Sequence, residues 1–166
     1  MRLRILVPAL LAASLLAACN PTYNWREHTS QEGHYKILFP AKPATFTRAV
    51  DLDGLRVQMT MTAAEIDGAT FAVGAATAPD AAHARAALPA MRQALLRNIG
   101  AADDAAPAVQ DGLRVEATGA ANGKPMHLHG RFEARGERFY QVIVLGPANA
   151  APPEQVDQFL SSFAPQ

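Results

Sequence analysis

Cysteine is almost absent from this chain, which has one such residue among 166. No intrachain disulfide and no cluster of thiolate metal ligands can form, so the folded state must be stabilised by packing. An excess of either charge is also missing, with 15 basic and 15 acidic residues. Nucleic-acid-binding domains carry a basic excess or a basic stripe, so we expect no nucleic-acid partner. Hydrophobic residues nevertheless make up 49% of the chain, which is enough for a folded core.

The apolar run at the N-terminus is too short to be a membrane-spanning helix. It extends from Ile5 to Leu16, and a spanning helix needs roughly 20 residues. Arg2 and Arg4 precede this run, and two alanines and a cysteine follow it. A positive start, a short apolar core and small residues before a cleavage point are typical of an export signal.

The end of this run, Leu16-Ala17-Ala18-Cys19, resembles the lipobox of bacterial lipoproteins. The resemblance implies cleavage before Cys19, acylation of its thiol, and anchoring in the cell envelope with the protein facing the periplasm. Several acyl chains hold a protein firmly, whereas one chain alone binds a membrane only marginally. Asn20, in place of an aspartate after the cysteine, favours the outer membrane under the sorting pattern of enteric bacteria. An ordinary secretory signal with a chance cysteine and a cytosolic protein with a buried cysteine are the alternatives.

The resemblance divides the chain into three parts. Residues 1–18 are expected to be a signal peptide, residues 19–33 a polar lipidated tether, and residues 34–166 a single domain. The tether is predicted because this stretch has no sustained apolar period. Within it, we expect Trp25 to pack on the first strand of the domain, with the lipid interface as the alternative.

The domain is predicted to be α+β, with a mainly antiparallel sheet of about seven strands in the order ββββ-α-βββ-α, covered by two helices. Alternating polar and apolar residues predict the strands, and the apolar second half of the last one predicts a central strand buried on both faces. Pro79 and Asp80 predict the start of the first helix, Gly100 its end, and Pro89 a kink or break. The predicted strands are 35–39, 44–50, 55–62, 70–77, 109–118, 125–133 and 137–145, and the second helix is 152–163.

Two short segments resemble PsbP-like domains, which are α/β/α sandwiches. They are residues 35–43, Tyr-Lys-Ile-Leu-Phe-Pro-Ala-Lys-Pro, and residues 159–163, Phe-Leu-Ser-Ser-Phe. Known members of that family act as accessory or binding proteins, so the resemblance implies a non-catalytic role. It carries over no functional residues.

His127 and His129 are the strongest candidates for a metal site, because residues two apart on a strand project from the same face. Met59 and Met61 have the same spacing, and paired histidines and methionines suggest copper. The alternation places the methionines on the core side and the histidines on the more polar side, so we expect the sheet to separate the two pairs. Ordinary solvated strand residues are the alternative for the histidines.

The preferred functional hypothesis is therefore a lipid-anchored binding or accessory module that is not an enzyme. It needs no cofactor, and its expected partners are the membrane, through Cys19, and a protein of unknown identity. The alternative hypothesis is a periplasmic copper-binding protein that uses His127 and His129. No Gly-x-Ser-x-Gly motif or glycine-rich phosphate loop supports an enzyme.

Overall fold

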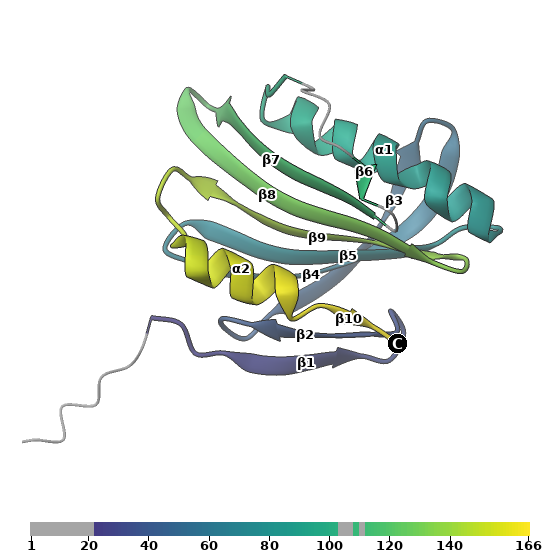
Figure 1. Ribbon diagram of the computed structural model, residues 1–166, viewed down its shortest axis with the longest axis horizontal. Helices are drawn as coiled ribbons and strands as arrows, with labels where there is room; N and C mark the ends of the chain where they lie inside the picture. Colours follow the sequence, from purple (N-terminus) through teal and green to yellow (C-terminus); the bar gives the residue numbers. More distant parts are fainter. Residues whose placement is uncertain (1–21, 103–107, 110–111) are drawn as a thin grey trace, which may run out of the picture.

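The computed structural model describes residues 22–102, 108–109 and 112–166 (Figure 1). The segment that resembles a lipobox, which includes Cys19, lies outside these residues. The described part of the chain forms ten strands and two helices: β1 (Arg26–Ser30), β2 (Tyr35–Phe39), β3 (Ala44–Leu52), β4 (Leu55–Ile66), β5 (Ala69–Thr77), α1 (Ala81–Asn98), β6 (Ala108–Val109), β7 (Gly112–Ala121), β8 (Lys124–Arg135), β9 (Arg138–Pro147), α2 (Pro153–Ser161) and β10 (Ala164–Pro165).

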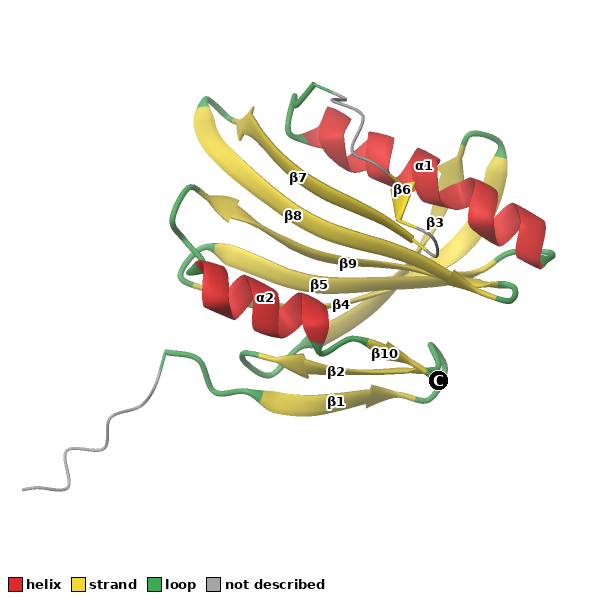
Figure 2. Cartoon of the chain, in the orientation of Figure 1, coloured by secondary structure: helices red, strands yellow, loops and turns green. Residues whose placement is uncertain are grey.

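The strands form two antiparallel sheets. The larger sheet has the order β3-β4-β5-β9-β8-β7-β6, and the smaller one has the order β1-β2-β10. Helix α1 packs on one face of the large sheet, which we call the α1 face. Helix α2 and the small sheet together cover the opposite face, which we call the α2 face (Figure 2). The large sheet is thus the middle layer of the molecule.

Strand β9 shows why both faces of the large sheet are covered. Phe139 and Ile143 point into the core beneath α1, whereas Tyr140, Val142 and Val144 point into the core beneath α2. A strand that is apolar on both faces is stable only between two packed layers. The prediction of a central strand buried on both sides is confirmed, since β9 lies between β5 and β8.

The predicted strand count and order are wrong. Instead of seven strands in the order ββββ-α-βββ-α, five strands precede α1, four follow it, and one more follows α2. The additional strands are β1, β6 and β10. Strands β6 and β10 have two residues each, too few to show a period. The observed order of strands and helices does not support the resemblance of residues 35–43 and 159–163 to PsbP-like domains.

The expected tether overlaps β1, which was not predicted. Arg26–Ser30 pairs along its whole length with β2. Its sequence, Arg-Glu-His-Thr-Ser, shows no apolar alternation because β1 is an edge strand of the small sheet and none of its residues is fully buried. Backbone hydrogen bonding to β2 therefore determines its conformation. The folded part of the chain begins closer to Cys19 than the polar composition predicts.

The ends of α1 are where the sequence predicts them. Asp80 is the N-cap and accepts a hydrogen bond from the His83 backbone N–H at 2.8 Å. Gly100 has a φ of 60° and completes a Schellman motif, in which Ala101 donates to the carbonyl of Leu96. Helix α1 is continuous through Pro89, so the predicted division into two helices does not occur.

Candidate functional site

A polar cleft lies where the turn between β1 and β2 faces the β3–β4 hairpin. Its volume is about 270 Å³, which makes it large enough for a small metabolite. Most of its lining side chains carry a hydroxyl or an amide, and we call it the hydroxyl cleft. It is lined by Ser30, Glu32, Gly33, Tyr35, Thr47, Gln58, Thr60, Ala75, Ala76, Thr77 and Arg138.

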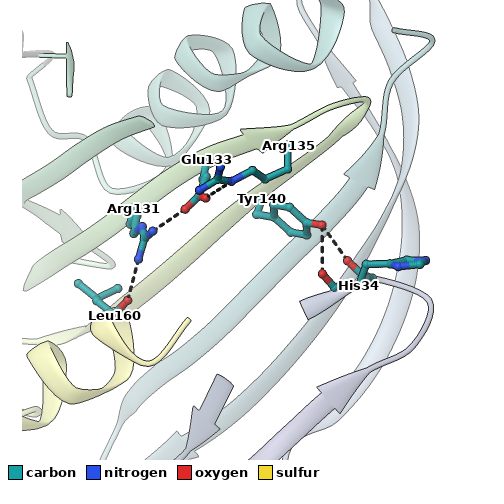
Figure 3. A network of polar contacts seen from close by, with 7 residues as sticks. His34, Arg131, Glu133, Arg135, Tyr140 and Leu160 are labelled. Atoms are coloured by element: carbon teal, nitrogen blue, oxygen red, sulfur yellow. Dashed lines mark hydrogen bonds and ion pairs between the residues drawn. The ribbon is translucent and has the colours of Figure 1, made fainter. Parts of the chain in front are cut away.

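The β1–β2 turn forms one wall of the hydroxyl cleft and is held by hydrogen bonds. The Gly33 N–H donates to the Ser30 hydroxyl at 2.9 Å. From β9, the Tyr140 hydroxyl donates to the carbonyls of Gly33 at 3.0 Å and His34 at 3.5 Å (Figure 3). The carbonyl of His34 also accepts from the backbone N–H of Gln166 at 2.7 Å. Contacts from the large sheet and from the C-terminus thus position this wall.

The β3–β4 hairpin forms the opposite wall through a ladder of threonines. The hydroxyls of Thr47 and Thr60 are 2.8 Å apart, and those of Thr45 and Thr62 are 3.1 Å apart. In each case the two residues are directly opposite in the antiparallel register. Cross-strand threonine pairs stabilise a sheet. Thr47 and Thr60 line the cleft, so the lone pairs that remain after their mutual hydrogen bond are available to a ligand.

The charged groups of the cleft are Arg138 and Glu32. Arg138 is half-buried at the start of β9, and Glu32 is exposed in the β1–β2 turn. Within the described residues, the Arg138 guanidinium has neither a hydrogen-bond partner nor an ion-pair partner. Its positive charge lowers the pKa of Tyr140, although burial outweighs this effect and raises that pKa.

Tyr35 is buried at the base of the cleft, with 2% of its surface exposed. Burial raises the pKa of its phenol, and side-chain hydrogen bonds with Thr62 and Ser30 oppose that rise. The phenol is therefore neutral at physiological pH and able to donate a hydrogen bond. The hydroxyl cleft consequently offers one cation, one peripheral anion and several neutral hydrogen-bonding groups.

The structure places His127 and His129 elsewhere, on the α2 face of β8. Their ring centroids are 6.5 Å apart, and the Nδ1 atom of His129 lies 4.0 Å from the Oε1 atom of Glu116. Both rings border a cavity of only about 30 Å³. Among the described residues, no three His, Cys, Asp or Glu side chains are grouped so that they could hold a metal ion. The copper hypothesis thus gains no third ligand from this part of the chain.

The sheet separates Met59 and Met61 from the histidine pair, as the alternation predicts. Both methionines are buried in the core beneath α1. His129 shares its face of β8 with Arg131, which donates a hydrogen bond to the Leu160 carbonyl of α2 at 3.4 Å. The four side chains cannot meet at one metal ion.

A buried ionic cluster also lies on the α2 face of β8. Glu133 is 3% exposed and accepts hydrogen bonds from Arg131 and Arg135 (Figure 3). The guanidinium of Arg131 also lies 5.8 Å from the centre of the Phe163 ring. These contacts join β8 to the end of α2, so we interpret the cluster as structural. The alternation Arg131-x-Glu133-x-Arg135 indicates a shared face but not its burial.

The hydroxyl cleft could not be predicted from the sequence, because it combines residues from separate elements. Ser30, Thr60 and Arg138 come from β1, β4 and β9, and no local spacing relates them. The one local signal is the alternation of Thr45 with Thr47 and of Thr60 with Thr62. That alternation indicates a polar face but does not show that a second sheet closes over it.

No family model matches the chain, and no curated protein matches it. The crystal structure of a protein from Bacteroides thetaiotaomicron VPI-5482, solved at 1.50 Å, is similar with a TM-score of 0.49 and 13% sequence identity. The match covers 84% of this chain and 48% of that one, so the present chain spans about half the length of its structural neighbour. Neither helix in the described part of the chain is long and apolar enough to cross a membrane.

Proposed function

We propose that this protein is a lipoprotein of the bacterial cell envelope that acts as a non-catalytic binding module. The proposal rests on the segment Leu16-Ala17-Ala18-Cys19. This segment ends a short apolar run that follows two arginines, Arg2 and Arg4. The signal places the chain's single cysteine where a lipid anchor requires it. The hydroxyl cleft supports the binding role, because it is a concave polar surface with a cation, Arg138, that has no partner among the described residues.

The folded domain begins very near the proposed anchor. Tyr23 already packs on the domain, with its ring 6.2 Å from that of Phe71. Tyr23 is four positions after Cys19 in the sequence, and a fully extended chain covers at most about 14 Å over that span. The anchored domain would therefore lie against the bilayer, with the start of β1 nearest to it.

The hydroxyl cleft lies at the other end of β1 from the proposed anchor. β1 begins beside the N-terminal segment and ends at the turn that forms one wall of the cleft (Figure 1). Five residues of strand correspond to roughly 16 Å. An anchor at the start of β1 would allow the cleft to lie up to that distance farther from the membrane surface, where a ligand or a protein partner could reach it.

Replacing Cys19 with serine is expected to abolish lipidation and to release the protein from the membrane fraction. Serine is close in size but lacks the thiol that is acylated. The measurement is fractionation of expressing bacteria, combined with metabolic labelling by a fatty acid and mass spectrometry of the N-terminal peptide. Asn20→Ser is the matched control and should keep the label. An intact Met1 terminus or an unmodified Cys19 thiol in the natural product would contradict the proposal.

The short connection predicts efficient energy transfer from Trp25 to a dansyl-labelled phospholipid headgroup. Trp25 is the chain's single tryptophan, and its indole N–H is held by Gln155 of α2 at 3.1 Å, so its emission reports one position. Inserting a flexible Gly-Ser segment after Asn20 should lower the transfer, because the domain would then move away from the bilayer. Equal transfer with and without the insertion would show that the anchor does not hold the domain at the surface.

A further inference from the structure

We propose that the hydroxyl cleft binds a small organic carboxylate and that Arg138 is the residue that pairs with it. The inference rests on the proposed role of the protein as a binding module and names the chemical class of its ligand. Its basis is a half-buried guanidinium, without a partner in the described structure, among neutral hydroxyl and amide groups.

Arg138 differs from Arg131 and Arg135, two other arginines on the α2 face. Arg131 and Arg135 share the buried carboxylate of Glu133, whereas Arg138 faces the cleft. A partly desolvated charge is unfavourable unless it is paired, and a guanidinium presents a planar fork that matches a carboxylate. A bound carboxylate would supply the partner that the described part of the chain does not provide.

The charge of the cleft favours a monoanion over a phosphate. Arg138 contributes one positive charge and Glu32 one negative charge, so the lining has no net charge. A phosphate carries close to two negative charges at neutral pH, and Glu32 would repel the second one. For a ligand that also carries an ammonium group, Glu32 is instead a favourable partner.

The hydroxyl groups determine what the rest of the ligand can be. Thr47, Thr60 and Thr77 face the cleft, and a hydroxyl offers one donor and two acceptor positions. After the bond between Thr47 and Thr60, capacity remains for a ligand rich in hydroxyl or amine groups. A volume of about 270 Å³ corresponds to roughly nine water molecules. A sugar acid or an amino acid fits this size and this chemistry.

Calorimetric titration of the mature lipoprotein in detergent tests the inference. The probes are D-gluconate, L-alanine, D-glucose and inorganic phosphate. We expect saturable binding of gluconate or alanine, weakened roughly tenfold to a hundredfold in Arg138→Gln, which is the range for loss of a charge-assisted pair. Arg85→Gln, an exposed arginine on α1, is the matched control and should bind as the unmodified protein does.

The two carboxylates distinguish between sources of the ligand. Binding of gluconate, reduced by Thr60→Val, identifies a sugar acid, whereas binding of alanine, reduced by Glu32→Gln, identifies an amino acid. If Arg138→Gln proves unstable in a thermal melt, Arg138→Lys keeps the charge but removes the planar fork, and should also weaken binding.

Three results would overturn the inference. They are no binding of either carboxylate at millimolar concentration, binding that Arg138→Gln leaves unchanged, and binding of phosphate or glucose in preference to both carboxylates. The membrane fractionation of Cys19→Ser does not depend on Arg138. Failure of the ligand assignment is therefore distinguishable from failure of the proposed lipoprotein role.

Discussion

Replacing Phe159 with alanine is expected to lower the free energy of unfolding by about 4 kcal/mol, as large-to-small changes at fully buried aromatics do. Phe159 is fully buried in α2. Its ring centre lies 5.4 Å from that of Phe39 in β2 and 5.3 Å from that of Phe71 in β5. It therefore joins the helix, the small sheet and the large sheet at one point. Denaturant unfolding followed by circular dichroism measures the loss.

Phe46→Ala is the matched control for this prediction. Phe46 is 52% exposed on edge strand β3, so its truncation removes little buried surface and should change the free energy of unfolding by less than about 1 kcal/mol. Equal losses in the two variants would show that Phe159 does not link the layers as the structure indicates.

Glu133→Ala is expected to destabilise the protein by about 3 kcal/mol, at the lower end of the range for breaking a buried ion pair. The substitution leaves the guanidinium of Arg131 partly buried without its carboxylate, since that side chain is 29% exposed. The loss should not be larger, because the side chain of Arg135 is 58% exposed and water can hydrate its charge. The measurement is the same denaturant unfolding.

Two further variants separate the buried charge from a general effect of losing a carboxylate. Glu137→Ala removes an exposed carboxylate in the β8–β9 turn and should be close to neutral. Adding Arg131→Met to Glu133→Ala should recover part of the stability, because the unpaired charge is then removed. A double variant that loses the sum of the two single losses would contradict the assigned coupling.

Elements with a strong local period were predictable from the sequence. In β4, Leu55, Val57, Met59 and Met61 alternate with polar residues, and the structure places this row beneath α1. The apolar second half of β9 likewise predicts a strand covered on both faces. A strand that is buried on one face has alternating apolar residues, and a strand that is buried on both faces has consecutive apolar residues. Both patterns can be recognised in the sequence without coordinates.

Two strands of the small sheet, β1 and β10, show no such hydrophobic pattern in their sequences. Arg26–Ser30 is polar, and β10 consists of Ala164 and Pro165. Both strands form because β2 offers backbone hydrogen-bonding partners, and these do not depend on side-chain type. The expected tether overlaps β1 for the same reason, since polar composition indicates exposure but does not exclude a strand.

The candidate sites also differ in whether the local sequence is enough to predict them. The resemblance to a lipobox rests on four contiguous residues, so the sequence by itself predicts acylation of Cys19. The two-residue spacing of His127 and His129 likewise places them on one face of a strand. The hydroxyl cleft is different. Pairing within the large sheet brings Thr60 and Arg138 near each other, and Ser30 joins them only when the small sheet packs against the large one.

The sequence alone determined that the chain forms no internal disulfide and that it contains both strands and helices. It also determined the ends of α1 and the central position of β9 in its sheet. Tertiary structure alone decided the number and order of the strands, the separate small sheet and the cleft beside it. The physical reason is the range of the interactions. Period and capping act between neighbours in sequence, whereas sheet pairing and cleft formation depend on contacts between segments that the sequence keeps far apart.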